Sequence, residues 1–158
     1  MATLPLTKAG SIRLTEELQK LKTVERPAVI QAIAEARAQG DLSENAEYDA
    51  ARERQGFIEA RIKELEGVLS NSQIIEPSTL EAGEKIVFGA TVELEDLDSG
   101  EHVRYQLVGD AEADIKLNTI SISSPVARGL IGKHEGDTIK INVPSGEKEY
   151  EILSVEYI

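Results

Sequence analysis

The sequence predicts an α+β protein, in which an N-terminal antiparallel α-helical hairpin precedes a small antiparallel β-sheet domain with one short helix. Apolar residues recur with a helical period up to about residue 75, and they alternate with polar residues beyond residue 90, as in half-buried strands. The charge divides the chain in the same way: residues 1–75 carry 10 basic and 12 acidic side chains, and residues 76–158 carry 7 and 17. We therefore expect a coiled-coil domain at 1–75, a linker at 76–83 and a second domain at 84–158.

The predicted second helix carries a heptad seam. The steps between its seam positions alternate between three and four residues, and this sustained period of 3.5 implies left-handed supercoiling against another helix. The seam consists of Tyr48, Ala51, Gln55, Ile58, Ile62, Leu65 and Leu69, and the partner stripe upstream consists of Leu14, Leu18, Leu21, Val29, Ile33 and Ala36. Pro27 should kink or briefly break the first helix near residues 24–26, because proline lacks an N–H and clashes with the preceding turn.

The two helices should meet in a short connection. Gly40 supplies a helix stop, because glycine tolerates the left-handed conformation that commonly ends a helix. The second helix restarts within a few residues, so the two helices must run antiparallel and form an arm of ~30 residues, or ~45 Å. The connection is acidic: residues 41–44 hold Asp41 and Glu44, and no Lys or Arg occurs between Arg37 and Arg52.

Two interpretations of these acids remain open from the residues alone. Asp41 and Glu44 have the spacing of a capping box, with Ser43 as an alternative N-cap. They could also hold Mg²⁺, which takes oxygen ligands and is commonly bound by one or two carboxylates together with substrate phosphates. A cap can also be a ligand, so the two interpretations are compatible.

Five segments of the second domain alternate apolar and polar residues and predict five antiparallel strands. They cover residues 90–97, 102–109, 118–123, 137–143 and 148–158, and Gly-containing turns separate two of the pairs. Between the third and fourth strand, Ser124 can cap a short helix and Pro125 suits its first position.

The composition excludes several classes of protein. The chain has a net charge of −12, no cysteine and only two histidines, so it cannot form disulfides or thiolate metal sites and is poorly suited to histidine-based catalysis. A chain this acidic is not expected to bind duplex DNA over a broad surface, because neutralising the phosphates requires clustered Lys and Arg. No apolar run approaches the about 20 residues that span a bilayer, and no signal peptide is recognisable, so we expect a cytoplasmic protein without membrane association.

Three stretches of the sequence resemble the GreA transcript-cleavage factors of bacterial RNA polymerase: residues 33–55, 88–114 and 122–137. The resemblance spans the chain and implies an N-terminal antiparallel coiled coil followed by an FKBP-like domain. It also implies a function in transcription elongation. The coiled coil would enter the secondary channel of the polymerase and stimulate the polymerase's own Mg²⁺-dependent cleavage of the 3′ end of backtracked RNA, and the chain would not be an enzyme by itself.

The same resemblance assigns residues. Asp41 and Glu44 would be the essential carboxylates and would hold Mg²⁺ jointly with the polymerase. Arg37 and Arg52 would contact the RNA 3′ end, although a solvated helix face explains them equally well. Ser124, Pro125 and Arg128 would dock a monomeric factor on the rim of the secondary channel, where the alternative is a capped surface helix.

Two other functions are alternatives to the stimulation of RNA cleavage. A factor could bind the same channel and inhibit the polymerase without cleavage, which the unbroken match at the acidic segment disfavours. The second domain could act as a prolyl isomerase, which requires an aromatic-lined apolar cleft, whereas its aromatic residues are few.

Overall fold

The computed structural model describes residues 3–40 and 45–158. The chain divides into two compact units: residues 12–71 form one, and the residues up to Ser11 together with 72–158 form the other. The predicted division into 1–75, 76–83 and 84–158 differs from these units in two places, because the residues up to Ser11 and residues 72–83 fall in the same unit as residues 84–158. Among the described residues, no helix is both long enough and apolar enough to cross a bilayer.

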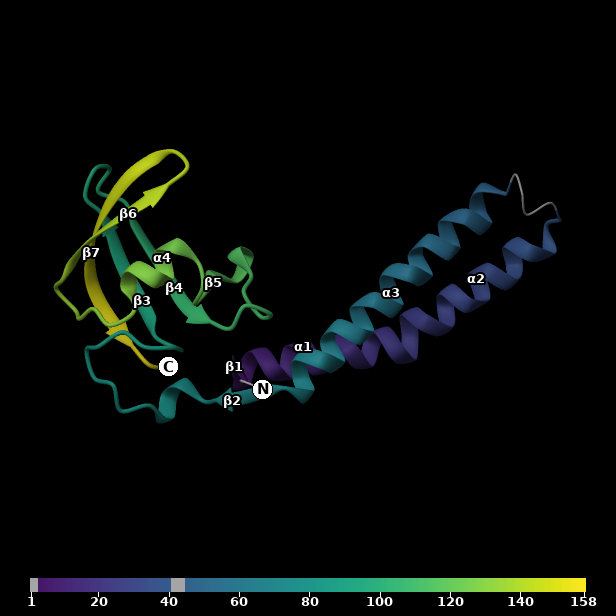
Figure 1. The fold of residues 1–158 in the computed structure, drawn as a ribbon, viewed down its shortest axis with the longest axis horizontal. Helices are drawn as coiled ribbons and strands as arrows, with labels where there is room; N and C mark the ends of the chain where they lie inside the picture. The colour runs from purple at the N-terminus through teal and green to yellow at the C-terminus, as the bar shows by residue number, and fades with distance from the viewer. Residues whose placement is uncertain (1–2, 41–44) are drawn as a thin grey trace. The chain divides into compact units, whose positions relative to one another are not determined.

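Residues 12–71 form the expected helical hairpin (Figure 1). The first arm is built from α1 (Lys8–Lys20), a π-helical segment (Leu21–Glu25) and α2 (Arg26–Ala38), and the second arm is α3 (Ala46–Ser70). The burial pattern agrees with the predicted seam, and Val29, Ile58 and Ile62 from the two arms pack into one cluster. Eight members of the seam and its partner stripe are buried. These members are Leu14, Val29, Ile33, Ala36, Ala51, Ile58, Ile62 and Leu65, whereas Leu18, Leu21, Tyr48, Gln55 and Leu69 are half-buried.

The sequence predicts a kink or brief break near residues 24–26, and the structure instead continues the helix there through the π-helical segment Leu21–Glu25. Pro27 lies in the first turn of α2, and the N–H of Arg26 donates to the carbonyl of Leu21, five residues earlier. This wider hydrogen bond lets the chain pass the proline ring, which has no N–H to offer and would clash in a regular turn.

Ion pairs link the two arms on their exposed edges. Arg26 binds Glu59 through two bonds of 2.9 and 2.8 Å, and Arg61 binds Glu17 through two bonds of 2.7 and 3.0 Å. The hydrogen bonds from Arg61 hold the pKa of Glu17 below its usual range. Each exposed pair contributes little alone, but paired arginine forks favour one alignment of the two helices.

The second unit contains a five-stranded sheet. Its strands are β3 (Thr91–Asp96), β4 (His102–Val108), β5 (Thr119–Ser121), β6 (Thr138–Val143) and β7 (Gly146–Glu156), in the order β5-β4-β3-β7-β6. The predicted strands are confirmed, but the sheet is mixed, because β5 pairs parallel to β4. Between them the chain returns through the 3₁₀ turn Ile115–Leu117 and reverses at Asn118, which has a left-handed φ of 56°.

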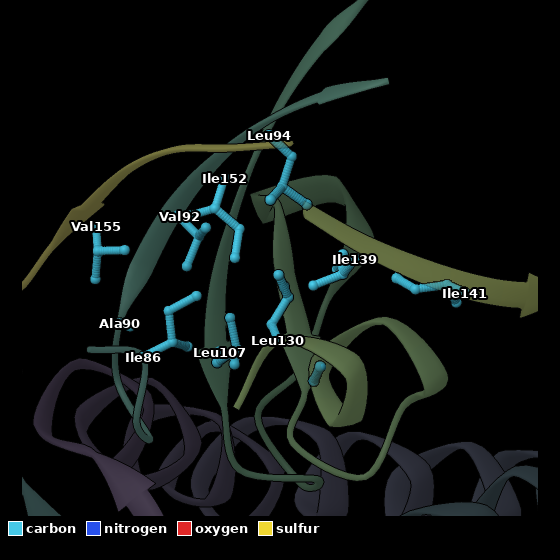
Figure 2. Close-up of a cluster of buried hydrophobic side chains, with 11 residues drawn as sticks. Ile86, Ala90, Val92, Leu94, Leu107, Leu130, Ile139, Ile141, Ile152 and Val155 are labelled. Atoms are coloured by element: carbon cyan, nitrogen blue, oxygen red, sulfur yellow. The ribbon is translucent and has the colours of Figure 1, made fainter. Parts of the chain in front are cut away.

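A hydrophobic core lies between this sheet and α4 (Pro125–Leu130). Figure 2 shows side chains of the sheet, including Val92, Leu107 and Ile152, gathered with Leu130 of α4. The alternation in β3 explains this arrangement, because Val92 and Leu94 are fully buried while Glu93 and Glu95 on the other face are only half-buried. The α+β fold class predicted from the sequence is thereby confirmed.

A parallel pair that the sequence did not predict holds the start of the chain in this unit. β1 (Leu4–Thr7) pairs with β2 (Ser72–Ile75). Thr7 then precedes α1 and accepts a hydrogen bond from Gly10 N–H at 3.0 Å. The buried carboxylate of Glu112 accepts hydrogen bonds from the Thr7 N–H at 2.8 Å, from the Thr7 hydroxyl, and from the Gly109 N–H at 2.9 Å. Glu112 thus anchors the first turn of α1 to the loop after β4.

Candidate functional site

The predicted catalytic and metal-binding residues, Asp41 and Glu44, lie outside the described residues, as does Ser43. Their neighbours on both sides are described. α2 ends at Ala38, and Gly40 has a φ of +110°, which agrees with its predicted role as a helix stop. On the other side, α3 begins at Ala46.

The N-cap of α3 is Asn45, so the predicted assignment of Asp41 or Ser43 to this role is wrong. The Asn45 Oδ1 accepts a hydrogen bond from the Tyr48 N–H at 3.0 Å. Its Nδ2 donates to the Ala36 carbonyl at 2.7 Å, in the last turn of α2. One amide therefore accepts from an N–H in the first turn of one helix and donates to a carbonyl near the end of the other, which a carboxylate could not do because it has no donor.

In the structure Arg37 and Arg52 line the same groove, which could not be seen from the sequence. Both line one groove of about 250 Å³ between α2 and α3, with Ile30 and Gln55 among the other lining residues. Arg52 donates to the Gln55 side chain at 3.3 Å, and the Arg37 guanidinium lies 5.9 Å from the centre of the Tyr48 ring. The ring face attracts the cation, so Tyr48 helps to orient Arg37.

The charges of these two arginines are not neutralised by ion pairs with any residue in 3–40 or 45–158. This distinguishes them from Arg26, Arg54 and Arg61, which all pair with glutamates. A groove lined by Ile30 and by two arginines that have no ion pair with a described residue suits an anionic ligand that also has an apolar face. The predicted role of Arg37 and Arg52 as RNA contacts stays a prediction.

No metal site is formed by the described part of the chain. In residues 3–40 and 45–158, no group of three His, Asp or Glu side chains is placed to hold an ion. Glu47 and Asp49, which follow the acidic segment, are exposed in the first turn of α3, where negative charge is favoured by the helix dipole.

The predicted docking residues lie together on α4. Ser124 is the N-cap and accepts a hydrogen bond from the Ala127 N–H at 3.3 Å, and Pro125 is in the first turn, as predicted. Pro125 and Arg128 are exposed, while Ala127 and Leu130 are buried in the core. The hydroxyl of Ser124 is thus occupied within the helix, while Pro125 and Arg128 are exposed on its surface, and the docking role of all three residues stays a prediction.

Sequence reasoning missed Asp110, which lies beside this helix. Its carboxylate accepts hydrogen bonds from the hydroxyls of Ser121 and Ser123, the second at 2.9 Å. The bond from Ser121, followed by that from Ser123, keeps the pKa of Asp110 below its usual range, and Arg128 adds to the effect. The serines at alternate positions 121 and 123 are visible in the sequence, but no local pattern indicates that their hydroxyls donate to Asp110.

Comparison with known proteins agrees with this architecture. A family model described as "Transcription elongation factor, N-terminal" matches residues 4–74, and one described as "Transcription elongation factor, GreA/GreB, C-term" matches residues 81–157. Together they cover nearly the whole chain.

Curated relatives match at full length. A transcription elongation factor GreA of Ralstonia nicotianae is 63% identical over 158 residues, which are 100% of both chains, and one of Xanthomonas campestris pv. campestris is 64% identical over 98% of both chains. The solved structure of GreA factor homolog 1 of Thermus thermophilus is 33% identical, covers 98% of this chain and 99% of its own, and has a TM-score of 0.44. The chain therefore belongs to the GreA/GreB family of transcription elongation factors.

Proposed function

We propose that this chain enters the secondary channel of bacterial RNA polymerase with its helical hairpin and stimulates the polymerase's own cleavage of the 3′ end of backtracked RNA. It does not catalyse the cleavage alone. It acts in the cytoplasm as a monomer, and cleavage rescues arrested elongation complexes. Family membership supports the proposal, and one observation carries it: the two packed helices are joined through a segment that contains Asp41 and Glu44.

The donor chemistry of Asp41 and Glu44 fits Mg²⁺, because carboxylate oxygens are the ligands that this ion prefers. Two carboxylates fill only part of its octahedral coordination, so we infer that the polymerase supplies further ligands and that the ion is shared. When bound there, Mg²⁺ would activate the attacking water and stabilise the leaving oxygen. In this proposal the chain contributes two carboxylate ligands for Mg²⁺, which its helical hairpin carries into the channel.

Arg37 and Arg52 support the same function. In the proposed complex they contact the phosphates of the RNA 3′ segment, because both line one groove and neither is ion-paired with a described residue. Tyr48 orients Arg37 through its ring. On α4, Pro125 and Arg128 contact the rim of the channel, with Ser124 holding the helix start.

The test uses an elongation complex stalled in a backtracked state, with the RNA labelled at its 5′ end. Asp41→Ala and Glu44→Ala should each lower the stimulated cleavage rate by at least about tenfold, as losses around a metal site commonly do. Both should still compete with the wild-type chain for the polymerase. Glu47→Ala and Asp49→Ala are matched controls, since they remove neighbouring exposed acids, and both should cleave like the wild type.

Measuring nucleotide addition in the same reactions separates this function from simple obstruction of the channel. Cleavage that survives at the wild-type rate in both Asp41→Ala and Glu44→Ala would contradict the proposal. If the wild-type chain slows nucleotide addition and no RNA fragment is released, the function would be inhibition of the polymerase and not stimulation of cleavage.

A further inference from the structure

Asp110 holds the segment that leads into α4. Its Oδ1 accepts hydrogen bonds from the Ser121 and Ser123 hydroxyls, and these two hydroxyls also lie 2.8 Å apart. The Ser123 N–H donates to Ser121 Oγ at 3.1 Å. A single carboxylate therefore gathers two hydroxyls of one loop, and charged acceptors make stronger hydrogen bonds than neutral ones.

The same loop is fixed from its inner side. Ile122, between the two serines, packs against the hydrophobic core, and its N–H donates to the Val108 carbonyl at 2.9 Å. Residues 121–123 thus have one side chain directed inward and two bound to Asp110. The loop has little freedom left as long as both attachments are present.

The bonds continue from this loop into the helix. The Ser124 N–H donates to the Ser121 carbonyl at 2.9 Å. Ser124 then caps α4 through its hydroxyl, and its carbonyl accepts from the Arg128 N–H at 2.9 Å. An uninterrupted series of contacts therefore connects Asp110 to Ser124, and through it to the exposed side chains of Pro125 and Arg128.

We propose that Asp110 is a positioning residue for docking on the polymerase: it holds Ser121–Ser124 in the shape that presents Pro125 and Arg128. The inference rests on the proposed function, because it requires α4 to be the docking element. Asp110 acts through the serines and does not itself bind the partner. Its effect is on affinity, because a loop that is ordered before binding has less conformational entropy to lose.

The decisive variants differ in what they leave at position 110. Asp110→Ala removes the acceptor, whereas Asp110→Asn keeps an acceptor oxygen in the same place without the charge. The readouts are the concentration of the chain that gives half-maximal stimulated cleavage and the rate at saturation. Asp110→Ala should raise the half-maximal concentration about five- to tenfold, the value of one or two lost hydrogen bonds, with an unchanged rate at saturation.

The Asn variant should stay within about twofold of the wild type, because it preserves the hydrogen bonds. Asp98→Ala is the matched control: it removes the same charge from an exposed turn of the same unit and should leave both readouts unchanged. A purely structural defect in the fold would lower the melting temperature and the saturating rate together, which the proposal does not expect.

The serines provide an independent arm, which also serves if Asp110→Ala does not fold. Ser121→Ala combined with Ser123→Ala should raise the half-maximal concentration as much as Asp110→Ala, and adding Asp110→Ala to this pair should have no further effect. If Asp110→Asn binds as weakly as Asp110→Ala, or if the serine pair binds like the wild type, the inference is overturned. Failure of the proposed function is distinguishable, because then the wild-type chain itself would not stimulate cleavage.

Discussion

Asn45 is the residue that joins the two arms of the hairpin beside the acidic segment. Its amide oxygen accepts a hydrogen bond from the Tyr48 N–H, and its amide nitrogen donates one to the Ala36 carbonyl. Tyr48 in turn lies under the guanidinium of Arg37. Arg37, one of the two side chains proposed to contact RNA, is thus supported through Tyr48 by a residue whose own role is to cap a helix.

Asn45 provides a test at the scale of a residue. Asn45→Ala should lower the free energy of unfolding by about 1–2 kcal/mol, because it removes the N-cap of α3 and the bond to α2. Asn45→Asp keeps the acceptor for the Tyr48 N–H but loses the donor to Ala36, so it should lose less. Urea denaturation measures both changes, and amide exchange at Tyr48 should accelerate in the Ala variant alone. Equal stability of Asn45→Ala and the wild type would refute the role.

The N-cap also shows where prediction from the sequence stops. Asp41, Ser43 and Asn45 are all good capping residues, and the spacing of Asp41 and Glu44 favoured the first. The N-cap in the structure is Asn45, whose amide also donates to the Ala36 carbonyl, nine residues earlier. No local pattern contains that contact. The positions of Arg37 and Arg52 in the chain were visible, but their common groove depends on how α2 packs against α3.

At the scale of elements, the first turn of α1 depends on a glutamate more than a hundred residues away. In an ordinary capping box the third helical residue reaches back to the N-cap N–H. Here that position is Gly10, and Glu112 supplies the carboxylate instead. A Cβ at Gly10 would lie 1.9 Å from the Glu112 side chain, so the absence of a side chain at residue 10 makes room for Glu112.

Two glycine substitutions should therefore have opposite effects on stability. Gly10→Ala should destabilise the protein by about 1–3 kcal/mol, because the new methyl group displaces the buried Glu112. Gly56→Ala, in the middle of α3, meets no atom within 4 Å and should stabilise by about 0.5–1 kcal/mol, since alanine favours the helix. Thermal denaturation compares the two, and stabilisation by both substitutions would show that Glu112 does not occupy this position.

The elements themselves were predictable to different degrees. The seam of the hairpin and the strands β3, β4, β6 and β7 follow periods of 3.5 and 2, which residues reveal locally. The parallel alignment of β5 was not predictable, because it depends on the reversal at Asn118. Likewise β1 and β2 are four-residue strands separated by more than sixty residues, and neither carries enough alternation to be recognised alone.

At the scale of the whole molecule, the chain consists of two units that are each stabilised by their own hydrophobic core. Each unit has a core of its own: Val29, Ile58 and Ile62 in the hairpin, and a larger cluster around Val92 and Leu107 in the sheet. The carboxylates proposed for the chemistry, Asp41 and Glu44, lie in the sequence between the two helices. We propose that these carboxylates complete a metal site whose remaining ligands belong to the polymerase.

The most direct test is the Mg²⁺ concentration that gives half-maximal RNA cleavage in a backtracked complex, measured with and without this chain. We expect the wild-type chain to lower this concentration by about tenfold or more, because it adds two carboxylate ligands. With Asp41→Ala or Glu44→Ala bound at saturation, the concentration should return to the value of the polymerase alone. A shared Mg²⁺ site would be contradicted if the wild-type chain accelerated cleavage without changing the Mg²⁺ requirement, or if the two variants lowered it as the wild type does.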